Sequence, residues 1–403
     1  ASNNTFIGGK AGGANTTGTS NVAVGTNALD ANTTANDNTA IGYSALTAAT
    51  TGAGNTAVGA YSLITVTDGT SNTAVGLSAL RTNAASGNTA VGTAAMYANT
   101  TGGNNTAVGV YALDASTTGA SNVAVGASAL SVSTSMSNNT AVGYQALNVC
   151  QSSGNTAVGK DAGKSLSTGG EATLVGYLCG DAMTTCNYNV AVGTQALGQC
   201  TTGNSNTAHG NQGLSGVTTG SDNIGIGYNA GNVVTDGTDT ISIGMNSDPS
   251  AAGGTNQITI GNESTGKGNS TGFINASGGA NYAGNNSASW STTSDRRIKK
   301  NIEDNNTGLD KINDIRVRNF EYRLPEEVDE ELPQSAAINK EGIQLGVIAQ
   351  EIMDILPDVV KQESTGCYTV DPDNLTWYLV NAVQELSAEV EQLKQKAHDK
   401  CDK

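Results

Sequence analysis

Asn21-Val22-Ala23-Val24-Gly25, Asn38-Thr39-Ala40-Ile41-Gly42 and Asn55-Thr56-Ala57-Val58-Gly59 are copies of one motif, and this motif decides the fold. Its glycine recurs sixteen times between Gly8 and Gly261, with thirteen spacings of 17 residues and two of 16. So small a variation in repeat length indicates that each copy occupies the same place in one coil of a stacked solenoid.

Other positions of the repeat form columns of their own. Val or Ile precedes the glycine in fifteen copies, with His209 as the exception, and Asn stands four residues before it in thirteen. Leu or Met follows four residues after the glycine in ten copies. We expect a short β-branched strand, a glycine turn and a Leu-bearing segment in each coil, with the Val and Leu columns as apolar ladders and the Asn column as an amide ladder.

The small Ala before each Val points to the opposite face of a strand, as at Ala23 and Ala40. We expect this Ala face to let neighbouring protomers pack closely. A helical solenoid is excluded, because a glycine every 17 residues among Thr, Asn and Ser is poor helix composition. The predicted class is mainly β: a parallel β-solenoid or β-roll shaft of sixteen coils, followed by a small α+β domain.

The Asn-x-(Ala/Val)-(Val/Ile)-Gly repeat resembles the head repeats of trimeric bacterial autotransporter adhesins. The resemblance implies parallel β-rolls with three chains side by side. The repeat of this chain is longer than the usual head repeat, so the number of strands in each coil stays open.

Charge divides the chain near residue 293. Residues 1–293 carry 12 acidic and 5 basic side chains, whereas residues 294–403 carry 23 and 14. We therefore predict a repetitive shaft over 1–265, a linker rich in Gly, Asn and Ser over 266–293, and a separate domain over 294–403. The start at Ala1, without an initiator Met or a signal-peptide pattern, leads us to expect a fragment or a processed chain.

The change of composition coincides with a dense motif. It reads Ser294-Asp295-Arg296-Arg297-Ile298-Lys299-Lys300-Asn301-Ile302. Further along stand Leu345-Gly346-Val347-Ile348-Ala349-Gln350-Glu351, Leu356-Pro357-Asp358-Val359-Val360, Tyr368-Thr369-Val370-Asp371 and Leu379-Val380-Asn381-Ala382-Val383-Gln384-Glu385-Leu386. Residues 290–397 thereby resemble the C-terminal intramolecular chaperone domain of phage endosialidases and tail fibres. The resemblance implies a trimerising domain that releases itself by autoproteolysis at Ser294.

The residues themselves allow this chemistry. A serine hydroxyl is a weak nucleophile unless a base takes its proton. Lys299 is the nearest candidate base, provided that burial or nearby positive charge lowers its pKa. Otherwise Ser294 would cap a helix and Lys299 would be a solvated charge. The preferred scissile bond is Thr293–Ser294, and the bond between Ser294 and Asp295 stays open.

The end of the chain predicts a coiled coil. Apolar residues recur at spacings of 4-3-4-3-4 over about two and a half heptads: Leu379, Val383, Leu386, Val390, Leu393 and Ala397. We expect helices over 345–356 and 374–397 and a short β segment near 367–371.

No cofactor and no metal site are expected. The six cysteines contain no CxxC pair, and the chain has two His. Cys150, Cys179, Cys186 and Cys200 cluster in the shaft, as buried small apolar residues or as disulfides between coils. Enzymatic activity is not expected in the shaft, because its acidic residues are scattered singly and do not form the facing pair of a glycosidase.

These observations predict a homotrimeric fibre of a virus or phage, which attaches to a host-surface receptor, with a glycan among the candidates. The net charge of −16 disfavours nucleic acid and anionic membranes as partners, and no apolar stretch predicts membrane insertion. The expected location is the virion fibre or tail, or an extracellular surface. The alternatives are a cell-surface trimeric adhesin and a lattice-binding solenoid with the same self-cleaving domain.

Overall fold

The chain divides into two compact units in a computed structural model, Ala1–Thr293 and Ser294–Lys403. The structure describes residues 2–276, 279–283, 290–291, 296–329, 341–362 and 366–401. Each unit is described by itself.

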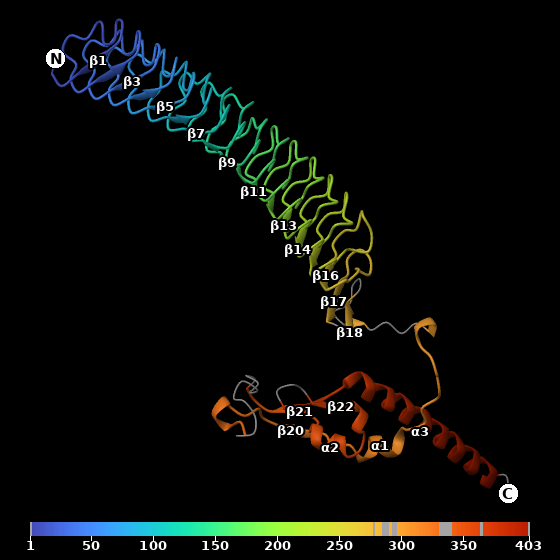
Figure 1. Cartoon of the computed structure of the whole chain (residues 1–403). Coiled ribbons are helices and arrows are strands. Elements are labelled where there is room, and N and C mark those ends of the chain that lie inside the picture. Colours follow the sequence, from blue (N-terminus) through green and yellow to red (C-terminus); the bar gives the residue numbers. More distant parts are fainter. Residues whose placement is uncertain are drawn as a thin grey trace. The chain divides into compact units, whose positions relative to one another are not determined.

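The first unit is a parallel β-solenoid with one short strand in each coil (Figure 1). Strands β1 to β17 pair in parallel, each with the next, and equivalent residues face each other, as Ala23 faces Ala40. This arrangement confirms the predicted fold class. The strands of the sixteen coils are β1 Thr5–Ile7, β2 Val22–Val24, β3 Thr39–Ile41, β4 Thr56–Val58, β5 Thr73–Val75, β6 Thr89–Val91, β7 Thr106–Val108, β8 Val123–Val125, β9 Thr140–Val142, β10 Thr156–Val158, β11 Thr173–Val175, β12 Val190–Val192, β13 Thr207–His209, β14 Ile224–Ile226, β15 Ile241–Ile243 and β16 Ile258–Gly261.

The repeating glycine ends each strand because no other residue fits there. Gly25 has φ +130°, and a Cβ atom on it would lie 2.6 Å from the carbonyl oxygen of Gly42 in the next coil. Both the backbone conformation and the close approach of the neighbouring coil therefore require glycine.

The assignment of the two strand faces was wrong. The Ala column, for example Ala40 and Ala57, is fully buried inside the coil, whereas the Val/Ile column is partly exposed, with Ile41 at 40% and Val108 at 37%. The coil interior next to a three-residue strand is too narrow for two columns of large side chains. Leu, which follows the turn, fills that interior, so only Ala fits on the inward face of the strand. Ala therefore cannot be the contact between protomers.

The Leu column is buried as predicted, but in an uncommon backbone conformation. Its ten residues have φ between +47° and +54°, a left-handed region in which non-glycine residues are scarce. Four coils carry glycine at this position, and other side chains take the space. A Cβ atom on Gly163 would lie 2.7 Å from Leu174 and 3.0 Å from Leu147.

The Asn column forms a buried ladder. The backbone N–H of Asn38 donates to Oδ1 of Asn21 at 3.0 Å, and Nδ2 of Asn38 donates to the carbonyl of Gly52 at 2.9 Å. Direct bonds between side chains of the column occur in fewer coils, such as Asn72 Nδ2 to Asn55 Oδ1 at 3.1 Å. The predicted amide ladder is therefore mainly a ladder from side chain to backbone.

The shaft cysteines are buried and unbridged, in agreement with the small-apolar interpretation. Cys179 replaces an alanine of the repeat, and burial raises the pKa of its thiol to about 12. Cys186 and Cys200, from adjacent coils, bring their Sγ atoms within 3.5 Å.

The sheet continues beyond the predicted shaft boundary at residue 265. Strand β17 (Gly272–Ala276) pairs in parallel with β16, and β18 (Gly279–Ala283) and β19 (Trp290–Ser291) follow in antiparallel pairing. Part of the segment predicted as a linker is therefore a cap of strands on the last coil.

The second unit is a small α+β domain. Its elements are η1 Arg296–Ile298, α1 Leu309–Asp314, β20 Arg318–Phe320, η2 Pro325–Glu327, β21 Gln344–Gly346, α2 Ala349–Met353, η4 Pro357–Val359, β22 Val360–Gln362, β23 Tyr368–Val370 and α3 Pro372–Cys401. Strands β20 and β21 pair antiparallel, as do β22 and β23. Ile352, Leu356 and Val359 form the buried core.

The helix predicted over 345–356 is correct only in its centre. Its first residues belong to β21, and the helix itself is confined to Ala349–Met353. The β segment and the long C-terminal helix lie where they were predicted.

Candidate functional site

The predicted catalytic pair is described in part. Thr293, Ser294 and Asp295 lie outside the described residues. Lys299 follows η1, where its backbone N–H donates to the carbonyl of Arg296 at 3.2 Å, and it is exposed. The Ser294–Lys299 pairing therefore stays a prediction.

The exposure of Lys299 bears on its chemistry. A lysine becomes a base only when burial or neighbouring cations disfavour its charge. Arg296 and Lys300 are also exposed. Within the described residues of one chain, none of these three cations is buried.

The segment that follows the pair is fastened to α3. Nδ2 of Asn381 donates to the carbonyls of Asn305 and Thr307 at 2.8 Å and 3.0 Å. Oε2 of Glu385 accepts the N–H of Leu309, at the start of α1, at 2.7 Å. These bonds fix the backbone six residues after Lys299 and so limit where Lys299 can lie.

Gly308 lies within this clamp of Asn381 and Glu385. A Cβ atom on Gly308 would lie 2.7 Å from the backbone nitrogen of Ala382. Glycine is required here because the backbone of the extended segment runs directly against the helix. The sequence pattern quoted Asn381 and Glu385 but gave no role for them, since their partners are 76 residues away.

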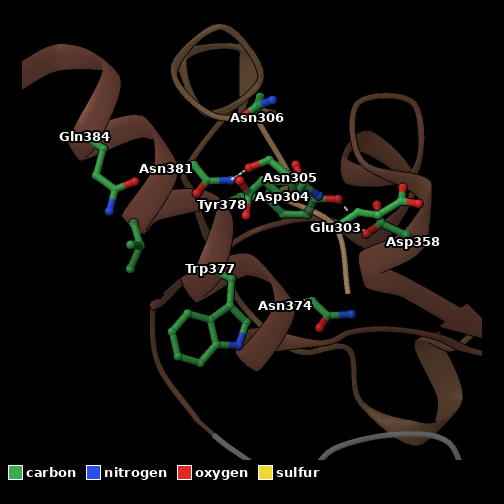
Figure 2. A pocket seen from close by; sticks show the side chains of 11 residues that line it. Glu303, Asp304, Asn305, Asn306, Asp358, Asn374, Trp377, Tyr378, Asn381 and Gln384 are labelled. Carbon is green, nitrogen blue, oxygen red and sulfur yellow. Dashed lines mark hydrogen bonds between the residues drawn. The ribbon is translucent and has the colours of Figure 1, made fainter. Parts of the chain in front are cut away.

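An open cavity of about 600 Å³ lies beside the clamp (Figure 2). The phenol of Tyr378 donates to Oδ2 of Asp358 at 2.6 Å, and this bond raises the pKa of Tyr378. Trp377 is 67% exposed at the mouth. The lining residues are Glu303, Asp304, Asn305, Asn306, Asp358, Asn374, Trp377, Tyr378, Val380, Asn381 and Gln384. The hollow is open and carries the three carboxylates of Glu303, Asp304 and Asp358.

A bidentate ion pair joins β20 to α2. Nε and Nη2 of Arg318 donate to the two carboxylate oxygens of Glu351 at 3.1 Å and 2.7 Å. The pair raises the pKa of Arg318 and lowers that of Glu351. Glu351 ends the quoted motif Leu345–Glu351, so the structure gives this motif a structural role.

Two kinds of site are absent from the described part of the chain. No group of three or more His, Cys, Asp or Glu is placed to hold a metal ion among the described residues. Within the same residues, no helix combines the length and the apolar character needed to span a bilayer.

The shaft and the domain define a class of protein, a repetitive β-solenoid followed by a small α+β domain that begins at a candidate self-cleavage site. Residues 294–361 match the family model described as Chaperone of endosialidase, which is named as a peptidase family. The second unit therefore carries a chaperone-of-endosialidase domain, and the match implies a self-cleaving, peptidase-like chaperone. No curated protein and no solved structure matches the chain. The match includes Ser294 and Lys299 and ends before α3, whereas the resemblance in sequence extends to residue 397. A β-solenoid shaft with this domain fits a fibre or tail-spike-like protein.

Proposed function

We propose that the chain forms a homotrimeric viral or phage fibre for attachment to a host surface. On this proposal the C-terminal domain assembles three chains, aligns them and then releases itself by cleavage at Ser294. The observation that carries the proposal is the union, in one chain, of a solenoid of near-identical coils with a chaperone-of-endosialidase domain.

The apolar face of α3 supports trimerisation. Leu386, Val390 and Leu393 are 49%, 40% and 63% exposed, and Val383 is 65% exposed. These side chains continue the predicted heptad seam. Full burial of each would contribute about 1.5–3 kcal/mol, so a single chain leaves a large stabilisation unused. Two further copies of α3 are the natural cover for a heptad stripe.

The outer face of the shaft supports it as well. Fifteen Val or Ile side chains form one column along the strands, and Thr or another β-branched residue lies two positions before each. Several of them are markedly exposed, such as Ile7 at 59% and Ile226 at 41%. A long uncharged apolar stripe is typical of a protein contact surface. We assign the contact between protomers to this Val/Ile column in place of the buried Ala column.

The proposed cleavage uses two side chains. Lys299 takes the proton of the Ser294 hydroxyl, whose oxygen attacks the carbonyl carbon of Thr293. The bond from that carbon to the Ser294 nitrogen breaks, the nitrogen receives the proton from Lys299, and an ester is left. Water then hydrolyses the ester and regenerates the hydroxyl. Cleavage thus separates residues 1–293 from residues 294–403 without a cofactor.

Two alanine variants test the pair. Ser294→Ala and Lys299→Ala should each leave full-length chains that still trimerise, since assembly depends on the fold of 295–397. Lys311→Ala, an exposed lysine of α1, is the matched control and should be cleaved at the parental rate. Denaturing and native masses measure both properties, together with the N-terminal sequence of the released fragment. Normal cleavage of either Ser294→Ala or Lys299→Ala refutes the pair.

A second experiment tests whether assembly switches on cleavage. Leu386→Asp with Leu393→Asp places charges in the heptad seam and should block both trimerisation and cleavage, because on this proposal a neighbouring protomer must bury Lys299 before it can act as a base. Ala388→Asp with Gln395→Asp adds the same charge on the opposite face and should do neither. A processing time course beside the size-exclusion mass gives the answer. Efficient cleavage by a species of monomer mass would show that one chain holds a complete site.

A further inference from the structure

Exposed tyrosines gather at one edge of the shaft, beside the turn that follows the repeating glycine. They stand one, two or five residues after that glycine and are between 36% and 50% exposed: Tyr43, Tyr61, Tyr97, Tyr111, Tyr144, Tyr177 and Tyr228. This edge, here called the tyrosine edge, is separate from the Val/Ile column on the strand. In a chain with 4% aromatic residues, such a concentration at one edge indicates a binding surface.

The tyrosine edge is hollowed at one place. A groove of about 360 Å³ spans three successive coils, and Thr93 and Ala94 of the middle coil are among its lining residues. Leu77 precedes Thr93 by one coil in the same column, and Tyr111 follows Ala94 by one coil. The small residues Thr93 and Ala94 thus lie between the larger Leu77 and Tyr111 of the neighbouring coils.

Asp114 contributes a partly buried carboxyl group to the lining of the groove. Its Oδ1 is buried and accepts no hydrogen bond from any residue that the structure describes. Burial raises the pKa of the carboxyl group, although the backbone N–H groups of Asp114 and Ala115 oppose the shift. Because Asp114 lines the groove, its carboxylate offers an acceptor to a ligand hydroxyl that enters from the open side.

Arg81 holds the aromatic wall of the groove in place. Its guanidinium lies 5.5 Å from the ring centres of both Tyr61 and Tyr97, and its Nη1 donates to the phenol oxygen of Tyr97 at 3.2 Å. A ring stacked against a cation and bonded at its hydroxyl loses little further freedom when a ligand binds.

A second, smaller groove of about 190 Å³ lies along the same columns. Asp181 stands five residues after its glycine, as Asp114 does, and burial raises the pKa of its carboxyl group too. Gln195 and Gln212 provide amide groups beside it. The two carboxylates are four coils apart, or about 19 Å at a strand spacing of ~4.8 Å. Two such grooves on one chain favour a ligand that repeats, such as a polymer on a surface.

We propose that the groove of Tyr97, Tyr111 and Asp114 binds a neutral sugar ring of a host-surface glycan. The C–H face of the ring would lie against a tyrosine, and a hydroxyl would donate to the Asp114 carboxylate. The proposal rests on the proposed function and names its ligand class. A sugar complements the groove in two ways, because it has an apolar C–H face for a tyrosine ring and hydroxyl donors for a carboxylate. Anionic glycans are disfavoured, because the groove contains a carboxylate and the shaft has 12 acidic against 5 basic residues. A second copy of the chain is the competing occupant.

The test uses the assembled, processed protein and a panel of immobilised oligosaccharides. The panel contains glucose-, galactose- and mannose-terminated chains together with sialylated and sulfated counterparts. We expect binding to at least one neutral member and weaker binding to its anionic counterparts. Tyr111→Ala and Asp114→Asn should each weaken that binding about tenfold or more. Tyr188→Ala is the matched control, since Tyr188 is 60% exposed away from the groove and has φ +60°, close to the +57° of Tyr111.

Four outcomes overturn the proposal. The first two are binding to no member of the panel and a preference for the anionic members. The third is equal binding by the parent, by Tyr111→Ala and by Asp114→Asn. The fourth is a change of assembly mass in Tyr111→Ala alone. The last outcome would assign the groove to the contact between chains. Attachment of the whole protein to host cells is measured in parallel. Attachment that persists in both groove variants rejects this groove and leaves the fibre function standing, whereas no attachment by the parent rejects the function itself.

Discussion

The Asn ladder of the shaft gives a prediction whose magnitude follows from the contacts of one residue. Oδ1 of Asn105 accepts the backbone N–H of Asn122 at 2.9 Å and its Nδ2 at 3.0 Å, while Nδ2 of Asn105 donates to the carbonyl of Gly119 at 2.8 Å. Asn105→Ala removes these bonds and leaves two buried backbone groups, the N–H of Asn122 and the carbonyl of Gly119, without these partners. At about 1–3 kcal/mol for each abandoned group, the loss is about 2–6 kcal/mol. Typical domains have a total stability of about 5–15 kcal/mol, so the loss is severe.

Thr106→Val is the matched control. Thr106 neighbours Asn105 but faces outward, and Val occupies the same column at Val22 and Val123, so this change should alter stability by less than about 0.5 kcal/mol. Thermal melts followed by circular dichroism rank the variants. Hydrogen exchange of the Asn122 amide reports the local bond directly. Equal melting of both variants, with the Asn122 amide still protected in Asn105→Ala, would refute the ladder as a main source of stability.

Three further predictions concern single positions. Gly25→Ala should destabilise the shaft by more than about 1 kcal/mol in thermal melts, because its new Cβ would lie 2.6 Å from a backbone oxygen. Gly170→Ala, whose new Cβ would have no atom nearer than 3.4 Å, should be close to neutral, and equal effects of the two changes would contradict the close approach. Asp371 accepts two backbone N–H bonds at the start of α3, which lowers its pKa, so Asp371→Ala should cost about 1 kcal/mol at pH 7 and Asp371→Asn less. A group with a lowered pKa stabilises the fold above its ordinary pKa and loses that effect as the pH falls through the lowered one. The melting temperatures of the parent and of Asp371→Ala should therefore approach each other as the pH falls below about 4, and a constant gap would contradict this reasoning. Asn381→Ala should slow self-cleavage although Ser294 and Lys299 remain, because the bonds from Asn381 to the segment 305–307 are lost. Asn374→Ala, which changes another residue of the same cavity, should leave the rate unchanged. Equal processing time courses would show that the clamp does not position Lys299.

The period of the repeat was sufficient to predict the solenoid, its parallel register and its sixteen coils. It was not sufficient to decide which strand face lies inside. Both Val24 and Ala23 are apolar, and alternation alone does not distinguish a narrow interior from a broad one. The Leu column, which enters from the other side of the turn, takes the interior space and leaves room for Ala only.

The backbone conformation of the Leu column was also not predicted from the sequence. Leu is among the last residues expected at positive φ, and Leu29 gives no sign of it in the motif. Gly12, Gly163, Gly180 and Gly231 replace Leu in the same column and have φ between +57° and +66°. These substitutions were the available signal, since glycine is the usual residue for that conformation.

The sequence predicted the candidate catalytic pair, which depends on residue types close together in the chain. It did not predict the clamp, which depends on contacts between residues far apart in the chain. The Ser294–Lys299 spacing can be read from the sequence, because a nucleophile needs a base nearby. The bonds from Asn381 and Glu385 to the segment 305–309 join residues 74 to 76 positions apart. No local pattern encodes such a pairing, so the clamp appears only in three dimensions.

The two faces of the coil explain why such a shaft would be joined to an aligning domain. Several irregular residues of the shaft point inward, where Ala172 interrupts the Asn column and Leu174 fills the space beside Gly163 and Gly180. They make each coil fit its covalent neighbours, but a second chain does not meet them. The outward Val/Ile column is nearly uniform, with His209 as its single exception in sixteen coils. In the proposed trimer, a slip by one coil would therefore replace each outer contact by an equivalent one and lose only those at the ends. Many registers of nearly equal energy make assembly slow and mixed. A unique, non-repetitive domain at one end removes this ambiguity, and it is no longer needed once the full length of the stripe has paired.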